Sequence, residues 1–566
     1  MRLLLLLFSL CFVVVLHSQS SEIILDGKFN DWTNKSTISR EPFNASSIPQ
    51  LTNLSVHNDE SFLYIRFTLD REIFPQRDNF LELYIDTDDN AATGQSIEDM
   101  GAELYYHFGQ RFGLFNADTL RPADIGTTIL PTHTNDEFEL RIFRFAFPDQ
   151  INPLLAGNPI KILLRGGSTS NNQLPEQGSL NYQFLEGPFT PFEPVSVEQP
   201  MTNSFRLASY NILRDRPLDP SFTPGFQRIV RAIDADVFCF QEFFDSSATQ
   251  VKNLMDETLD LGTDDGWYVT KEDFSTVTAS KYPIIQTLRI NNFANITASW
   301  IDLPSSFPND VVVINAHTTC CNFESERQFQ VDAIAAFINE LKARNGRMIV
   351  PQNTPIIVAG DLNLVGFKQQ LETILQGEII NVATFGTGGL PDWDDTPMED
   401  LAPTLTHEPA SFTWRSGGSS FTPGKLDYII YSDSELKAEN GFVFEPFFIP
   451  EDLLNSLNLT SSDAFFSDHL PVVGDFSMSP ITNTQELSFE NKINIFPNPA
   501  TTEINISSKN TGIGMASIYQ SNGQLIKSYP INLNQDKMDI SNLSAGNYWV
   551  RVNNNEHVEW FKIIKQ

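Results

Sequence analysis

Several apolar runs in the middle of this 566-residue chain end in a polar side chain that can bind a cation or carry a proton. These side chains are Asn211, Glu242, His317, Asp361, Asn363, Asp427, Asp468 and His469. Carboxylate and amide oxygens are hard ligands of the kind that Mg²⁺ prefers. An imidazole with a carboxylate partner has its tautomer fixed and its proton affinity raised. The set therefore predicts a site that combines a divalent cation with proton transfer.

Each of these residues has an ordinary structural explanation when it is taken alone. Glu242 follows a buried strand, as many surface residues do, and Asn211 is of a type that forms turns. His317 alone would be a structural histidine. His407, the third histidine of this region, does not stand at a strand end beside carboxylates or amides as the other two do. We favour a functional site because the ordinary explanations would all have to hold at once.

The elements that must position these residues are short strands that alternate with helices. Strands are expected from apolar runs with polar ends over residues 204–213, 235–243, 310–317, 354–363 and 425–432. A helix is expected before the fourth strand, because Val331, Ile334, Ile338 and Leu341 recur at steps of three and four residues. We expect Gly346 to close this helix as its C-terminal cap.

The order of these motifs resembles the endonuclease/exonuclease/phosphatase superfamily. The motifs are Asn211, Gln-Glu at 241–242, His317, Gly-Asp-Leu-Asn at 360–363, Asp427 and Ser-Asp-His-Leu-Pro at 467–471. The resemblance covers residues 203–480 and implies a four-layer α/β sandwich, in which two packed sheets are flanked by helices. It also implies phosphoester hydrolysis, since the family includes pancreatic-type deoxyribonucleases, abasic-site endonucleases, bacterial sphingomyelinases and inositol-phosphate phosphatases.

One group of residues would bind the metal ion of such an enzyme. A phosphodiester is anionic and repels nucleophiles, so its hydrolysis needs charge neutralisation at the phosphoryl oxygens. By the resemblance, Asn211, Glu242 and Asp468 would hold a Mg²⁺ or Mn²⁺ ion for this purpose.

A second group would act on the substrate itself, again by the resemblance. Asp427 would be the partner of His469, and His317 would contact the phosphoryl oxygen or the leaving group. Asp361 and Asn363 would hold the attacking water or a phosphoryl oxygen. Whether His469 or Asp361 is the general base stays open.

An all-β accessory sandwich is predicted for residues 21–200. Stretches such as 62–69 and 80–86 alternate apolar and polar residues, with Asp, Asn and Gly turns between them. The stretches 23–32 and 57–67 resemble the carbohydrate-binding family 9-like modules of secreted proteins, which implies a glycan as a ligand of this domain.

A turn of this accessory domain has the spacing of a calcium loop. Asp86, Asp88 and Asn90 stand at alternate positions, as oxygen ligands do in such loops. The bidentate glutamate expected at the twelfth position is replaced by Ile97. A solvated turn and a Ca²⁺ site therefore both stay open.

Both ends of the chain carry features of export. Residues 1–20 have a charged start and a short apolar run, and are predicted to be a secretory signal peptide. Residues 489–566 resemble the C-terminal sorting domain, a β-sandwich, of proteins exported by the type IX system of Bacteroidetes. No other segment is long and apolar enough to span a bilayer. We therefore expect a secreted or cell-surface protein whose partner is the type IX secretion machinery.

The adjacent cysteines Cys320 and Cys321 follow His317 closely. Adjacent cysteines lack the two-residue spacing of structural zinc sites, which disfavours zinc. Free structural thiols and a disulfide between the two neighbours both stay open.

The net charge of −34 argues against a tight nucleic-acid binder, which would carry a basic face. It does not exclude an enzyme that contacts phosphates briefly with the help of a metal ion. The leading hypothesis is a secreted divalent-metal phosphodiesterase, an extracellular nuclease that acts on DNA or RNA. One alternative is a phosphatase or a sphingomyelinase-like phosphodiesterase on the same scaffold, and another is a non-catalytic glycan-binding or adhesion protein.

Overall fold

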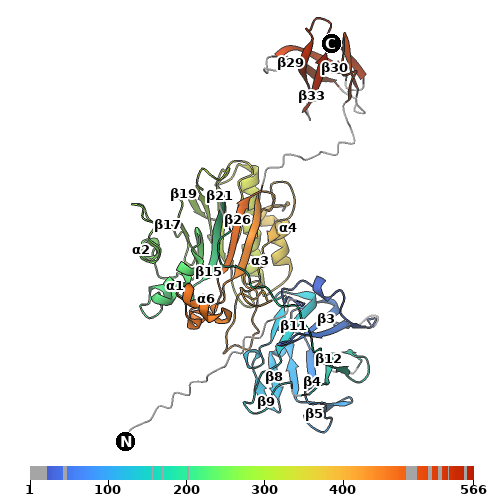
Figure 1. The fold of residues 1–566 in the computed structure, drawn as a ribbon, viewed down its shortest axis with the longest axis vertical. Helices are drawn as coiled ribbons and strands as arrows, with labels where there is room; N and C mark the ends of the chain where they lie inside the picture. Colours follow the sequence, from blue (N-terminus) through green and yellow to red (C-terminus); the bar gives the residue numbers. More distant parts are fainter. Residues whose placement is uncertain are drawn as a thin grey trace. The chain divides into compact units, whose positions relative to one another are not determined.

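The computed structural model describes residues 22–479 and 494–566, apart from 43–47, 156, 168–170, 201–202, 293, 508–512, 521–524, 533–534 and 554–557. The chain forms two compact units, Met1–Pro480 and Ile481–Gln566, and each is described by itself (Figure 1). The predicted signal peptide, residues 1–20, lies outside the described residues.

The N-terminal part of the first unit is built from two antiparallel sheets. One has the order β1-β2-β3-β11-β10, and the other has the order β13-β12-β4-β7-β8-β9, with β14 paired to β12. The strands of the first sheet are β1 (Thr37–Ser39), β2 (Leu51–Asn58), β3 (Phe62–Ile73), β10 (Thr128–Leu130) and β11 (Asn135–Phe143). Those of the second are β4 (Leu81–Asp86), β7 (Leu104–His107), β8 (Phe112–Phe115), β9 (Asp118–Leu120), β12 (Ile160–Gly166), β13 (Gln173–Leu174) and β14 (Leu180–Tyr182). A separate ribbon joins β5 (Gln95–Ile97) to β6 (Met100–Ala102).

Alternate side chains of these strands fill one core. Leu63, Ile65 and Phe67 of β3 are buried in the same cluster as Leu83 of β4 and Ile162 of β12. Because residues two apart on a strand lie on one face of the sheet, this pattern packs the two sheets face to face. The alternation in the sequence predicted this all-β sandwich.

A mixed α/β part follows, built on two six-stranded sheets. Their orders are β17-β18-β16-β15-β26-β25 and β19-β20-β21-β22-β24-β23. The first contains β15 (Ser204–Asn211), β16 (Val237–Gln241), β17 (Tyr268–Thr270), β18 (Val277–Ser280), β25 (Leu436–Val443) and β26 (Val472–Met478). The second contains β19 (Ile284–Arg289), β20 (Asn295–Ile301), β21 (Val311–His317), β22 (Ile356–Asp361), β23 (Glu399–Asp400) and β24 (Asp427–Tyr431). Leu207 of β15 shares a buried cluster with Val313 of β21 and Ile357 of β22, so the two sheets pack against each other.

Helices pack against both sheets. They are α1 (Thr223–Ile233), α2 (Ala248–Thr258), α3 (Glu324–Ala343), α4 (Gln369–Gln376), α5 (Val382–Phe385) and α6 (Glu451–Ser456). Phe226 of α1 and Val251 of α2 belong to one cluster with Phe240 of β16. Ile334 of α3 belongs to another with Val358 of β22. Figure 1 shows α1 and α2 in green on one side of the sheets and α3 and α4 in yellow on the other.

The helix predicted from the spacing of Val331 and Ile334 is confirmed as α3. The prediction that Gly346 caps it is wrong, because the helix ends at Ala343 and the next residue, Arg344, takes the left-handed conformation with φ 52°. The Arg344 guanidinium donates a hydrogen bond from Nε to the Val350 carbonyl at 3.2 Å. This contact within the segment after the helix helps to hold a non-glycine residue in a conformation that glycine adopts at lower cost.

The strand register brings the polar ends together. In the parallel pair β21–β22, His317 lies opposite Asp361, and in the antiparallel pair β22–β24, Asp361 lies opposite Asp427. In the other sheet, the parallel pair β15–β16 places Asn211 opposite Gln241, the residue before Glu242. Ends of parallel strands meet at one edge of a sheet, so the polar tips of the two packed sheets share one edge.

The sandwich and the α/β part are joined by buried contacts. Arg141 of β11 forms an ion pair of 2.5 Å with Glu408, and the two side chains are 5% and 1% exposed. Leu25 pairs with Ala410 as an isolated bridge. These contacts explain why residues from both parts fall in one compact unit.

The second unit is a small β-sandwich. Its sheets have the orders β27-β28-β31 and β30-β29-β32-β33. The strands are β27 (Asn494–Phe496), β28 (Glu503–Ser507), β29 (Ile513–Gln520), β30 (Leu525–Asn532), β31 (Gln535–Asp539), β32 (Gly546–Asn553) and β33 (Val558–Lys565). Ile504, Ile518 and Val550 share its core. Within the described parts of the chain, no helix is long and apolar enough to cross a membrane.

Candidate active site

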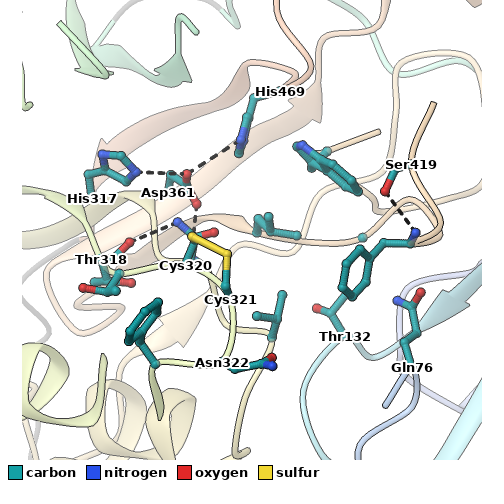
Figure 2. A pocket seen from close by; sticks show the side chains of 18 of the residues that line it. Gln76, Thr132, His317, Thr318, Cys320, Cys321, Asn322, Asp361, Ser419 and His469 are labelled. Atoms are coloured by element: carbon teal, nitrogen blue, oxygen red, sulfur yellow. Dashed lines mark hydrogen bonds and ion pairs between the residues drawn. A yellow bond between two sulfur atoms is a disulfide. The ribbon is translucent and has the colours of Figure 1, made fainter. Parts of the chain in front are cut away.

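A cavity of about 970 Å³ lies at the edge where the strand ends meet (Figure 2). The predicted site residues that line it are Glu242, His317, Asp361, Asn363 and His469. The other three are each hydrogen bonded to a lining residue: Asn211 to Glu242, Asp427 to His469, and Asp468 to Trp414. The fold thus gathers all the predicted residues in one place.

Asn211 links carboxylates that come from different sheets. Its Nδ2 donates to Glu242 Oε1 at 3.1 Å and to Asp361 Oδ2 at 3.0 Å. Its own side-chain oxygen accepts from the backbone N–H of Leu213 at 3.1 Å. The amide therefore fixes the distance between Glu242, which follows β16, and Asp361, which ends β22.

Two of the site residues have a positive φ, which is rare for glutamate and more common for asparagine. Glu242 has φ 71° and Asn363 has φ 46°. The Glu242 N–H donates to Ser275 Oγ at 3.0 Å, and the Asn363 side chain donates to the Thr318 carbonyl at 3.0 Å. Such conformations persist where surrounding contacts hold them, and they cluster at functional sites.

His469 is paired with Asp427 behind the cavity. Its Nδ1 lies 2.8 Å from Asp427 Oδ2, and the same carboxylate oxygen accepts a hydrogen bond from Thr413 Oγ1 at 2.7 Å. Burial lowers the pKa of His469, but the carboxylates of Asp427 and Asp361 outweigh it and raise this pKa to about 10. Without other cations nearby, the ring would carry a proton at neutral pH.

The imidazole rings of His317 and His469 both lie near the same carboxylate oxygen of Asp361. Its Oδ2 lies 3.6 Å from His317 Nε2 and 3.7 Å from His469 Nε2, as the dashed lines in Figure 2 indicate. Burial raises the pKa of the Asp361 carboxyl, while the His469 and His317 charges act in the opposite direction. A carboxylate with this environment can bind a cation or accept a proton.

His317 is oriented by a residue that the sequence did not suggest. Ser275 Oγ lies 2.7 Å from His317 Nδ1, so that Nε2 is left to face Asp361. Thr413, which holds Asp427, was also missed. Neither residue ends an apolar strand, and a single hydroxyl in a loop gives no pattern that could have singled it out.

The residues present fit a divalent cation. Ligand atoms of Asp361, Asp427 and His469 all lie within 4.8 Å of one another. Asp427 Oδ1 and Asp468 Oδ1 are buried and have no hydrogen-bond partner among the described residues. In the described part of the chain, no lysine or arginine forms an ion pair with these acidic residues or with Glu242. A bound cation would offset this concentration of negative charge.

The adjacent cysteines form a disulfide that lines the cavity. Cys320 and Cys321 are bonded to each other, and Cys321 has a positive φ of 65°. Arg327 of α3 is fully buried and donates hydrogen bonds to the carbonyls of Thr319 and Cys321. The loop after His317 is therefore held by hydrogen bonds from the first turn of α3.

This fold and this site define an α/β enzyme with a carboxylate–imidazole centre. Residues 208–469 match the model of the Endonuclease/Exonuclease/phosphatase family. This match confirms the resemblance that the motifs predicted, and it supports a phosphoester hydrolase.

A second family model matches the end of the chain. Residues 494–566 match the Secretion system C-terminal sorting domain. This match confirms the resemblance to type IX sorting domains, so the protein is secreted or attached to the cell surface.

Several solved structures match part of this chain, and they share little of its sequence. ANGEL2, a 2′,3′-cyclic phosphatase, is 15% identical, with 49% of this chain and 97% of that chain covered and a TM-score of 0.33. An endonuclease/exonuclease/phosphatase family protein from Leptotrichia buccalis is 16% identical over 49% and 100%, with a TM-score of 0.31. Sphingomyelinase C from Streptomyces griseocarneus is 19% identical over 48% and 99%, with a TM-score of 0.30. No curated protein matches the chain.

Proposed function

We propose that this protein is an exported phosphodiesterase that depends on Mg²⁺ or Mn²⁺, and that DNA or RNA outside the cell is its leading substrate. The observation that carries the proposal is the convergence of His317 and His469 on one oxygen of Asp361, beside carboxylate oxygens that have no partner. The predicted four-layer order, helix–sheet–sheet–helix, is part of the same proposal. The separate clusters that α1 and α3 form with opposite sheets support this order.

The metal ligands would be the predicted Glu242 and Asp468, whereas Asp361 would hold the attacking water or a phosphoryl oxygen. Asn211 was predicted as a ligand too, but its amide nitrogen faces Glu242 and Asp361, which favours a role in holding these carboxylates. A bound divalent cation would neutralise phosphoryl oxygens and lower the pKa of a water molecule.

The remaining residues would bind the phosphoryl group and move protons. The oxygen of a water would attack phosphorus, and the bond to the leaving oxygen would break. The proton of the water would pass to Asp361, or to His469 if the charge of a bound cation lowers the pKa of that ring. Asp427 keeps His469 in one tautomer through Nδ1, and Ser275 does the same for His317. His317 and Asn363 would contact the phosphoryl oxygens or the leaving group, which then takes up a proton.

An activity panel with the full chain tests the proposal. The substrates are plasmid DNA, RNA, a phosphocholine diester and a phosphomonoester, each with Mg²⁺, Mn²⁺ or a chelator. We expect hydrolysis of a nucleic acid with either ion and none with the chelator. Hydrolysis of the phosphocholine diester or the monoester alone would transfer the proposal to the alternative substrates, and a folded protein inert toward all four would refute it.

We also propose a Ca²⁺ site in the N-terminal sandwich. Carboxylate oxygens of Asp86, Asp88 and Glu103 lie within 4.8 Å of one another, and Glu103 occupies the acidic position that Ile97 does not fill. Glu103 is 7% exposed, and its Oε1 is buried without a partner. Because Oε2 is occupied by Thr87 N–H at 2.8 Å, Oε1 is the oxygen left for a cation.

Calorimetric titration with Ca²⁺ tests this site. We expect binding by the wild-type chain and at least about tenfold weaker binding by Glu103→Gln, with Glu98→Gln as the control, since ligand charge sets calcium affinity. Equal binding by Glu103→Gln and the wild type would contradict the assignment.

The resemblance of residues 23–32 and 57–67 to glycan-binding modules remains a proposal for the same domain. A glycan array probed with the full chain would test it, and an absence of binding would remove the glycan as a ligand. A purely adhesive role for the whole protein is disfavoured, because the complete polar set lies together at one cavity.

A further inference from the structure

We propose that the N-terminal sandwich forms one wall of the active-site cavity, and that this wall selects short, single-stranded phosphodiesters with a planar base-like group. The inference rests on the proposed function, because it assigns the substrate class of that same site. The observation behind it is that residues 74–77, between β3 and β4 of the sandwich, line the cavity together with His317 and Asp361.

The segment 74–77 is bonded to the catalytic part at several points. Gln76 Oε1 accepts a hydrogen bond from the Thr422 N–H at 2.8 Å. Arg111 of the sandwich donates to the Gln76 carbonyl at 2.8 Å and also to Ser420 Oγ of the catalytic part at 3.4 Å. The rings of Phe74 and Phe367 lie 5.2 Å apart between centroids. Figure 2 shows Gln76 and Thr132, both of the sandwich, beside the loop that carries Ser419.

One carboxylate connects segment 74–77 with the disulfide loop, which also lines the cavity. Glu324, at the start of α3, forms ion pairs with Arg77 of the sandwich and with Arg327 of the helix. Arg327 in turn donates hydrogen bonds to the carbonyl of Cys321. The sandwich segment and the disulfide loop are therefore held by the same charged network, and the cavity has a fixed width at this point.

The lining has few groups that could bind a long polyanion. Arg77 is the single lysine or arginine among the described lining residues, and it is ion-paired with Glu324, which also pairs with Arg327. Nucleic-acid polymers gain most of their affinity from many lysine and arginine contacts to phosphates. The cavity therefore suits a substrate with one or two phosphates near the metal site.

The same lining is rich in aromatic faces. Phe274, Phe323 and Phe421 are 60%, 54% and 44% exposed although they border the cavity. The Arg111 guanidinium lies over the ring of Phe421, 4.2 Å from its centroid. Trp414 also lines the cavity. Aromatic side chains bind unpaired bases by stacking, without preference for sequence.

Polar groups lie among these rings. Gln76, Asn322 and Ser419 line the cavity, and each offers a hydroxyl or an amide. A nucleobase has donors and acceptors at its edge, which an acyl chain lacks. This mixture favours a base over a lipid tail as the group beside the phosphate.

Two esters with the same leaving group provide the test on the full chain. Thymidine 5′-p-nitrophenyl phosphate carries a base, whereas methyl p-nitrophenyl phosphate does not. For the wild type we expect kcat/KM to be at least about tenfold higher with the thymidine ester, the size of effect that stacking one base produces. In Phe421→Ala and Phe74→Ala, this ratio should fall toward one.

Control variants and outcomes separate this inference from the proposed function. Phe147→Ala removes an exposed phenylalanine of the sandwich that does not border the cavity, and should keep the wild-type ratio. A ratio near one in the wild type, or an unchanged ratio in both wall variants, would overturn the inference while leaving the phosphodiesterase in place. Faster hydrolysis of duplex than of single-stranded oligonucleotides, or a preference for sphingomyelin vesicles, would overturn it as well. If neither aryl ester is hydrolysed while the activity panel detects hydrolysis of another phosphoester, the inference fails and the proposed function stands; if all of these substrates are inert, the proposed function itself fails.

Discussion

Asp361 is the residue on which the site converges. Its Oδ2 accepts a hydrogen bond from Asn211 and faces both His317 and His469, so one carboxylate connects groups from four strands or strand ends. Its burial keeps water from screening these contacts, which strengthens each of them. Changes at a single residue of this set should therefore affect turnover far more than folding.

Replacement of His469 by alanine is the first prediction at this scale. We expect at least about a hundredfold loss of turnover, because a positioned acid or base contributes that much to proton transfer. His407→Ala is the matched control, since His407 does not border the cavity. Turnover on the thymidine ester and a thermal unfolding curve would be measured for both, and near-normal turnover by the His469 variant would refute its role.

The sequence allowed prediction of these residues because each follows or opens an apolar strand. Ser275 and Thr413 could not be predicted in the same way. Their importance comes from hydrogen bonds to His317 and Asp427, and such contacts between distant loops leave no periodic pattern.

At the scale of elements, the register of neighbouring strands decides what meets at the edge. The parallel strands β21 and β22 approach each other closely near their C-terminal ends, where Gly360 is paired with Ala316. Gly360 has φ 151°, and a Cβ built there would lie 1.8 Å from the Ala316 carbonyl oxygen. Only glycine allows this approach.

Gly360→Ala should therefore separate the two strand ends. We expect a loss of about 1–3 kcal/mol in the free energy of unfolding, the usual cost of forcing an extra carbon into a packed region. Gly417→Ala serves as the control, because a Cβ there meets nothing within 4 Å. Urea unfolding would be compared for both variants, and equal midpoints would contradict this explanation of the glycine.

The strands and α3 could be predicted from periodicity, but the end of α3 could not. Gly346 fitted the usual preference for glycine after a helix, whereas the helix ends at Ala343 and Arg344, two residues before Gly346, takes the left-handed conformation. Arg344 is held there by a hydrogen bond to the Val350 carbonyl, six residues further along the chain, and the preference for glycine takes no account of such a contact.

At the scale of the whole molecule, the sandwich and the catalytic part fold as one compact unit. The sequence predicted both parts but not their contact. Arg141 and Glu408 are far apart along the chain, and nothing local marks them as partners in a buried ion pair. For the same reason, the contribution of residues 74–77 to the cavity could be found only in three dimensions.

His133, in the connection between β10 and β11, should make the stability of this unit depend on pH. Burial, together with the charges of Lys368 and Lys425, lowers the pKa of His133 to about 4, and Glu372 acts in the opposite direction. The unfolded chain then binds more protons than the folded one between pH 6.5 and 4, so stability falls as the pH falls through this window.

The full effect is about 3 kcal/mol below pH 4, from 1.36 kcal/mol per pKa unit. Urea unfolding of the wild type and of His133→Gln would be compared at pH 7.5, 5.5 and 4.5. We expect the wild type to lose more stability than the variant at the lower values. Parallel losses in the two proteins would contradict a buried, neutral His133.

The central claim is that distant strand ends assemble a metal-dependent phosphoesterase site, and one measurement tests it most directly. Hydrolysis of thymidine 5′-p-nitrophenyl phosphate would be followed for the full chain and for Asp361→Asn, after chelation and again after addition of Mg²⁺ or Mn²⁺. We predict no turnover in chelator, recovery with either ion in the wild type, and at least about a hundredfold lower recovery in the variant. Full turnover in the presence of chelator, or equal recovery by Asp361→Asn, would contradict the account.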